Sequence, residues 1–200
     1  MPRAVVPSES QPISCAGAPS YDPDRMTAAA AIAFLLSNFP LTFFVIGLIF
    51  SFVAISRAPR PLTEATVIEK LISWHVFFAI AACALYNFIM HVFFGAMAAR
   101  FIGWADSPFQ FEVGTASLGF AAVGFLAAFG SFDLRLAAIL GVGVFTLGAA
   151  VGHIYQMVSA HNFAPGNAGV IFYTDIFIPL FGFFLLWRQR RLAAARRSRR

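Results

Sequence analysis

Four long stretches of the 200-residue chain contain no Asp, Glu, Lys or Arg, and they constrain what the chain can fold into. They cover residues 26–56, 71–99, 113–132 and 136–174. A helix needs about 20 apolar residues to cross a bilayer, so each stretch is long enough for at least one crossing. The chain is 60% hydrophobic and 12% charged, which lies outside the usual composition of a soluble globular domain. We therefore predict an integral membrane protein.

The number of spans follows from where these stretches are interrupted. The last one is long enough for two crossings and is broken by HNFAPGNAG, 161–169, whose Pro, Gly and Asn residues are typical of a turn. Continuous apolar runs such as 41–55 do not alternate as the strands of an outer-membrane barrel do. We expect an all-α, polytopic membrane helix bundle with about five transmembrane helices. Their expected ranges are 29–54, 70–98, 112–131, 136–159 and 168–187.

The two ends of the chain differ in composition from this bundle. We expect a flexible polar tail over 1–26, a single transmembrane helical domain over 27–188 and a basic cytoplasmic tail over 189–200. The first tail lacks the short basic region that opens a cleavable signal peptide, so the first helix is expected to be retained. Met26 is an alternative translation start. The two cysteines fall in the tail and in the second span and are not expected to pair.

The basic residues predict which way the bundle faces, because Lys and Arg collect in cytoplasmic loops. With five spans, eleven of the fourteen lie on one side, and only Arg3, Arg25 and Arg100 lie on the other. We expect the N-terminus outside and the C-terminus inside a bacterial cytoplasmic membrane. The final RRLAAARRSRR is expected to contact anionic lipid, at about 1 kcal/mol per residue near the surface, rather than nucleic acid.

Two polar, turn-rich segments, GWADSPFQFE and HNFAPGNAG, are expected to share the outer face and to meet there. His91, His153 and Asp175 lie on three spans at a common depth of roughly 10 Å, from a rise of about 1.5 Å per residue. Ionisable groups inside a membrane generally face the bundle interior or a wet cavity. We predict a polar pocket near the periplasmic face, roofed by the two segments. Its candidate residues are Asn87, His91, Trp104, Gln110, Glu112, His153, Gln156, His161, Asn162, Asn167 and Asp175.

Three functions are open for this pocket. The first is to bind or conduct a small molecule or ion. The second is a metal-dependent membrane enzyme, in which a divalent metal activates water and Glu112 or His161 acts as general base. The third is an accessory subunit of a membrane complex, in which the Phe-rich exterior is the contact surface. The metal ligands of the second would be His91, His153 and Asp175, with Glu112 as a fourth candidate ligand when His161 is the base; their chemical types fit zinc, manganese or iron, but their spacing shows no local motif.

Two further features concern the histidines and glycines of the spans. A b-type haem held by His91 and His153 is a less favoured cofactor than a metal ion. His75, near the inner end of the second span, is expected to anchor that interface. Gly148 and Gly152 fit the GxxxG spacing, which predicts close packing of the third and fourth spans, with homo-oligomerisation as the alternative.

Two blocks carry a resemblance to known proteins: YNFIMHVFFGAMAARFIGWADSPFQFEVGTASLGF and GHIYQMVSAHNFAPGNAGVIFYTDIFIP. With them the chain resembles a family of small, uncharacterised bacterial integral membrane proteins. The resemblance extends from about Ser37 to Trp187. It implies a multi-pass membrane protein and brings no activity, cofactor or site residue with it.

Overall fold

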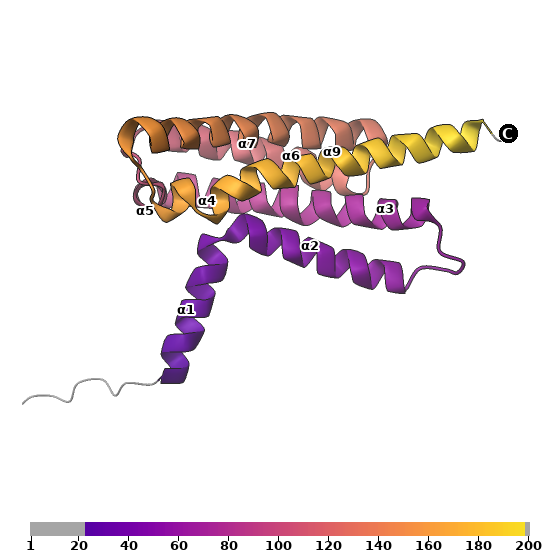
Figure 1. Cartoon of the computed structure of the whole chain (residues 1–200), viewed down its shortest axis with the longest axis horizontal. Helices are drawn as coiled ribbons and strands as arrows, with labels where there is room; N and C mark the ends of the chain where they lie inside the picture. The colour runs from indigo at the N-terminus through magenta and orange to yellow at the C-terminus, as the bar shows by residue number, and fades with distance from the viewer. Residues whose placement is uncertain (1–22, 199–200) are drawn as a thin grey trace, which may run out of the picture.

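The computed structural model describes residues 23–198, and over that range it consists of helices joined by short turns (Figure 1). Five helical segments are long and apolar enough to cross a membrane: Phe39–Ser56, Glu64–Phe93, Phe109–Ala128, Phe132–Ala160 and Pro165–Arg197. The prediction of an all-α bundle with five transmembrane helices is confirmed. The predicted tail 1–26 lies outside the described residues except for its last four, which begin α1.

In chain order the elements are α1 (Pro23–Ser37), α2 (Phe39–Ser56), α3 (Glu64–Trp74), the π-helical η1 (His75–Ala82), α4 (Cys83–Phe93), α5 (Gly95–Ile102), α6 (Phe109–Ala128), α7 (Phe132–Ala160), α8 (Pro165–Ala168) and α9 (Val170–Arg197). The second span consists of α3, η1 and α4 in succession. The fifth span begins with the single turn of α8 and continues as α9, so most of the predicted basic tail is helical.

The first predicted span, 29–54, is two helices rather than one. α1 leaves the bundle at the start of α2 and projects away from it (Figure 1). The break follows from Pro40, whose ring nitrogen carries no hydrogen and cannot donate to the carbonyl of Leu36. That carbonyl instead accepts a hydrogen bond from the Tyr86 hydroxyl at 3.2 Å. The crossing therefore begins at Phe39, and the predicted boundary was wrong.

The second span also ends earlier than predicted. Its helix stops at Phe94, where φ is −129°, and α5 begins at Gly95 as a separate short helix. α5 ends at Gly103, whose φ of 76° is the left-handed conformation that glycine adopts readily. The predicted range of 70–98 was therefore too long at its end, because it included the first residues of α5. The consequence for the site is that α5 lies at the end of the bundle, beside α8 (Figure 1).

Glycine brings the second and third spans together, rather than the third and fourth. A Cβ atom on Gly124 would lie 2.9 Å from Cβ of Ala81 in η1, and one on Gly114 would lie 2.5 Å from a side-chain carbon of Val92 in α4. These close approaches let α6 pack tightly on the second span. A Cβ on Gly148 would meet no atom within 4 Å, so the GxxxG pair mediates no close helix contact within the described chain.

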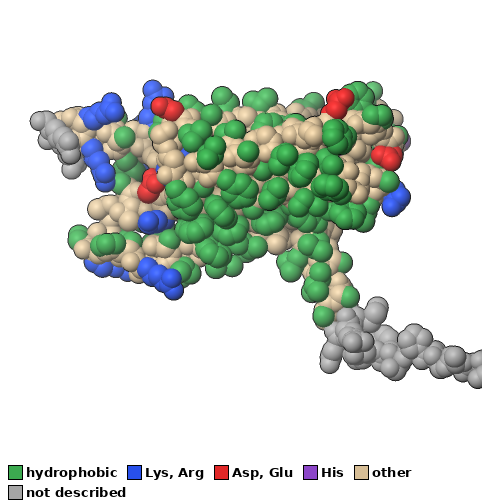
Figure 2. Space-filling view, turned by 180° about the vertical axis from the view of Figure 1, so that it is seen from behind, with side chains coloured by type: hydrophobic (Ala, Val, Ile, Leu, Met, Phe, Trp, Pro, Cys, Tyr) green, Lys and Arg blue, Asp and Glu red, His purple; other side chains and the backbone are tan. Residues whose placement is uncertain are grey.

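Lys and Arg side chains gather at one end of the bundle, and the flank between the ends is apolar (Figure 2). We call this the basic end; α2 ends there, α3 begins there, and α9 extends beyond it (Figure 1). The opposite end, formed by α5 and α8, is called the cavity end. Arg100 lies at the cavity end.

A buried arginine ties the helices together at the basic end. Arg135, in the first turn of α7, is 2% exposed, although its place in the sequence suggested a loop. Its guanidinium donates two hydrogen bonds to the carboxylate of Glu69 in α3, at 2.9 and 2.7 Å. It also donates to the backbone carbonyls of Ala127 and Ala128, at 3.3 and 3.2 Å. One side chain thus connects α3, α6 and α7.

Candidate functional site

A cavity of about 520 Å³ lies inside the bundle near the cavity end. Its wall is formed by the start of α2 and by η1, α4, α6, α7 and α9, and residues of α5 and the following loop close it toward the end of the bundle. Most of the lining side chains are aliphatic or aromatic, and no Lys or Arg of the described residues lines it. A concave space of this size, with an apolar wall and a few polar groups, is typical of a small-molecule site.

The predicted pocket residues divide into three sets. Six of the eleven line the cavity: Asn87, His91, Trp104, Gln110, His153 and Asp175. Asn162 and Asn167 belong to the segment that covers the cavity and are described below. Three lie elsewhere: Glu112 is exposed in the first turn of α6, His161 is the exposed C-cap of α7, and Gln156 is one turn before it. The position of these residues along the bundle could be predicted, whereas the direction of each side chain could not.

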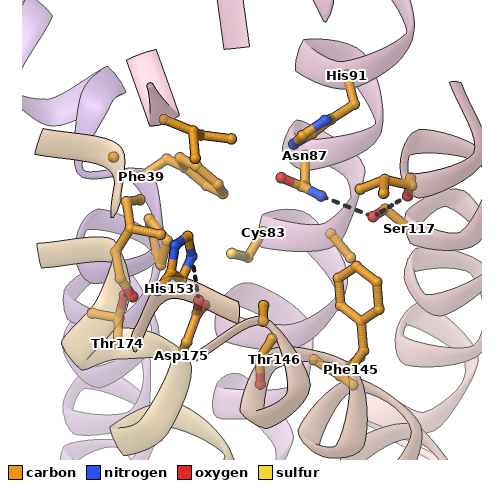
Figure 3. A pocket seen from close by; sticks show the side chains of 18 of the residues that line it. Phe39, Cys83, Asn87, His91, Ser117, Phe145, Thr146, His153, Thr174 and Asp175 are labelled. Atoms are coloured by element: carbon orange, nitrogen blue, oxygen red, sulfur yellow. Dashed lines mark hydrogen bonds and ion pairs between the residues drawn. The ribbon is translucent and has the colours of Figure 1, made fainter. Parts of the chain in front are cut away.

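His153 has a partner on each side of its ring. Its Nδ1 lies 2.8 Å from Oδ1 of Asn167, and its Nε2 lies 3.5 Å from Oδ2 of Asp175 in α9. Figure 3 shows the imidazole and the carboxylate facing one another at the cavity. His153 is buried at 5% exposure, so this pair of ionisable groups lies in the interior.

Asn167, in α8, holds His153 in this position. Its side chain is fully buried, and its amide nitrogen donates to the backbone carbonyls of His153 and Asn162, at 3.2 and 2.9 Å. Its amide oxygen accepts from the indole N–H of Trp104 at 3.0 Å. Carbonyl oxygens only accept and an indole N–H only donates, so the network determines which side of the amide is oxygen.

The segments GWADSPFQFE and HNFAPGNAG meet over the cavity, as predicted. The side-chain amide of Asn162 donates to the carbonyls of Ile102 and Gly103, at 3.0 and 3.2 Å. Gly166 lies against Phe101, where a Cβ would come within 2.7 Å of the backbone oxygen. Only glycine fits this approach, so α8 packs directly on α5 and closes the cavity from that side.

A second polar group lies on the opposite wall, between α4 and α6. The amide nitrogen of Asn87 donates to the Ser117 hydroxyl at 2.9 Å, and that hydroxyl donates to the carbonyl of Val113 at 2.8 Å. The amide oxygen of Asn87 points away from Ser117, toward the cavity (Figure 3). Nδ1 of His91 pairs with Oε1 of Gln110 at 2.5 Å. The cavity therefore has polar groups on two facing walls and apolar surface between them.

The four predicted metal ligands are not brought together. His153 pairs with Asp175, His91 pairs with Gln110, and Glu112 is exposed. Among residues 23–198, no three side chains of His, Cys, Asp or Glu are close enough to hold one metal ion. The haem interpretation meets a similar difficulty, because both ring nitrogens of His153 already have partners.

Sequence reasoning missed several polar residues of the cavity wall. Cys83 lies in the middle of the wall, between the Asn87 pair and His153 (Figure 3). Ser117 and Thr146 also line the cavity, and the hydroxyl of Thr146 has no hydrogen-bond partner in the described chain. Hydroxyls and thiols are common in membrane helices, so composition alone does not distinguish them.

His75 lies outside the cavity and is not an interface anchor. It is 3% exposed, and its ring packs edge-on against Phe44 and Phe181, with centroids 6.1 and 5.3 Å apart. Neither ring nitrogen has a hydrogen-bond partner among the described residues. His75 is therefore a core residue rather than an interfacial one.

Comparison with known families agrees with the resemblance seen in the sequence. The model of a family of unknown function, DUF6790, matches residues 37–195, from the last residue of α1 into the last turn of α9. The chain belongs to this family. No curated protein and no solved structure matches the chain. Because DUF6790 carries no assigned activity, function has to be argued from the site itself.

Proposed function

We propose that this member of DUF6790 binds a small molecule, with an apolar body and a hydrogen-bond-donating head, in the cavity near the periplasmic face. The cavity itself supports this most directly: about 520 Å³, with an apolar wall and few polar groups. The groups that face it include two acceptors, the carboxyl group of Asp175 and the amide oxygen of Asn87. With no Lys or Arg of the described chain in the lining, an anionic ligand would lie unpaired in an apolar site, which is costly.

Binding is better supported than conduction. Between the cavity and the basic end, buried residues of α3, η1, α6, α7 and α9 form a packed core. Ile72, Val76, Ile139 and Leu185 are each 0% exposed. They close the cavity toward the basic end, where Arg135 lies beyond them. A ligand in the cavity therefore has no open route through the bundle to the basic end.

The orientation of the protein decides which compartment supplies the ligand. We expect the basic end to face the cytoplasm of a bacterial cell, with the arginines of α9 against anionic lipid. A reporter fused after Arg200 should then be active only in its cytoplasmic form, and one inserted at Asp106 only in its periplasmic form. The reverse pattern in the two fusions would place the cavity at the cytoplasmic face and contradict this assignment.

Cys83 offers a direct test of binding, because its thiol lies at the cavity wall. In a Cys15→Ala background it is the single cysteine of the chain. The purified protein in detergent is treated with methyl methanethiosulfonate, and modification is followed by intact-protein mass spectrometry. We expect 2-(1-naphthyl)ethanol, a neutral apolar alcohol, to slow the reaction about tenfold at ten times its dissociation constant, by mass action.

A matched pair of substitutions on α7 controls for indirect effects. Ala149→Phe adds a ring inside the cavity, and Ala137→Phe adds the same ring on the exposed surface of the same helix. We expect Ala149→Phe to remove the effect of the alcohol and Ala137→Phe to retain it. If saturating alcohol leaves the reaction of Cys83 unchanged in the parent protein, the cavity does not bind this class of molecule.

A further inference from the structure

The hydrogen bonds around His153 determine where its ring carries a proton. Oδ1 of Asn167 is an acceptor, because the amide nitrogen of the same side chain is occupied by two backbone carbonyls. Nδ1 of His153, 2.8 Å from that oxygen, must therefore be the N–H donor. This leaves Nε2 as the ring atom that faces Asp175.

The pair formed by His153 and Asp175 then holds one further proton. Nε2 and Oδ2 are 3.5 Å apart, and without a proton both would be acceptors directed at each other. With one proton the pair is either an imidazolium and a carboxylate or a neutral imidazole and a carboxylic acid. Both forms have a net charge of zero. Losing that proton would leave one uncompensated negative charge in a largely apolar cavity, which is costly.

Among the described residues, the cavity lining holds no Lys or Arg that could compensate that charge. The titratable side chains that line it are Cys83 and His91 on α4, His153 on α7 and Asp175 on α9. α6 and α8 contribute no charged side chain to the lining, and His75 of η1 lies outside it. Only a proton or a cationic ligand can therefore balance the Asp175 carboxylate.

The surroundings of Asp175 favour a cation that carries N–H groups. The carboxylate of Asp175 is a hydrogen-bond acceptor that faces the cavity. Six aromatic residues line the cavity, and aromatic rings attract cations through their faces. They are Phe39, Phe101, Trp104, Phe109, Phe120 and Phe145.

We infer that the cavity binds an apolar ammonium ion in exchange for the proton shared by His153 and Asp175. This rests on the proposed function, because it names the ligand class of the same cavity. The ammonium ion donates its N–H groups to the carboxylate, one proton leaves the pair for bulk water, and His153 remains neutral with its proton on Nδ1. The site has zero net charge before and after the exchange, and no covalent bond is formed or broken.

The test compares two probes of the same shape on the full-length protein in detergent. 2-(1-naphthyl)ethylamine is a cation near neutral pH, and 2-(1-naphthyl)ethanol is its neutral counterpart. Proton release is measured with an indicator dye in weak buffer, and affinity is measured by protection of Cys83. We expect about one proton released per amine bound and none per alcohol. The dissociation constant of the amine should fall about tenfold for each unit by which the pH is raised, because one proton is released for each amine bound.

Variants extend the test to the two residues. Asp175→Asn should abolish proton release on addition of the amine, whereas Gln156→Ala, outside the cavity, should leave it at the level of the parent protein. The measurement on the parent protein needs no variant and decides the inference even if Asp175→Asn does not fold. Amine binding without proton release, or with an affinity independent of pH, overturns the inference while protection by the alcohol still supports a binding site. If neither probe protects Cys83, both the inference and the proposed function fail.

Discussion

Replacing Glu69 with Ala is expected to destabilise the protein by about 2 kcal/mol, because it leaves a buried guanidinium without its half-exposed carboxylate partner. Arg135 is 2% exposed, and Glu69 accepts two of its hydrogen bonds. Taking a charge out of water is tolerated only when the charge is paired, so removing one partner costs more than the pair contributes. The measurement is the free energy of unfolding in mixed micelles as SDS is increased, followed by loss of helical circular dichroism.

A double substitution separates the cost of the unpaired charge from the loss of an ordinary contact. Glu69→Leu with Arg135→Leu removes both charges, and we expect it to be more stable than Glu69→Ala alone. Glu112→Ala is the control, because that carboxylate is exposed and makes no ion pair among residues 23–198, and it should change stability by no more than about 0.5 kcal/mol. A Glu69→Ala protein as stable as the Glu112→Ala protein would show that Arg135 is not isolated from water.

Asn167→Ala is expected to cost on the order of 3 kcal/mol and to loosen the cover of the cavity. The side chain is fully buried and makes four hydrogen bonds, each worth roughly 1 kcal/mol net, more where the partner is left buried and unsatisfied. Two partners are backbone carbonyls, which need a donor. An ionised aspartate only accepts hydrogen bonds, so Asn167→Asp should be destabilised as well. Unfolding in SDS gives the stability, and the rate at which Cys83 reacts gives the opening of the cavity.

Gln156→Ala is the matched control for Asn167→Ala. Gln156 lies one turn after His153 on the same helix and makes no side-chain hydrogen bond within the described chain. Its replacement should change neither the free energy of unfolding nor the reaction of Cys83. If Asn167→Ala resembles Gln156→Ala in both measurements, the amide does not hold the two segments over the cavity together.

The membrane helices were predictable because their signal is local. An uncharged run of about 20 residues identifies a crossing without reference to any other part of the chain. The break before α2 was missed because residues 26–56 carry no charge on either side of it. Pro40 and Asn38 mark the break, but a proline inside a membrane helix is often tolerated, so the sequence did not separate a kink from an end.

For the site, the sequence predicted the position of each residue along the helix axis but not the direction of its side chain. A constant rise per residue puts His91, His153 and Asp175 at one depth, and all three line the cavity. Glu112 lies near the same end but is exposed, because the direction of a side chain depends on which neighbours its helix packs against. The partners that define the chemistry are non-local. Asn167 is 14 residues from His153, and Glu69 is 66 residues from Arg135, so no short motif contains either pair.

The bend between α1 and α2 connects the cavity mechanically to the surroundings of the protein. Residues 27–36 of α1 are all exposed, whereas Phe39 and Pro40, just past the bend, are part of the cavity wall. The bend is held from the bundle by Tyr86, whose ring centroid lies 4.7 Å from that of Phe39 and whose hydroxyl bonds the carbonyl of Leu36. α1 is therefore joined to the bundle at a bend that borders the cavity wall. Turning α1 about this bend would disturb the ring contact between Phe39 and Tyr86 and the hydrogen bond from Tyr86 to Leu36.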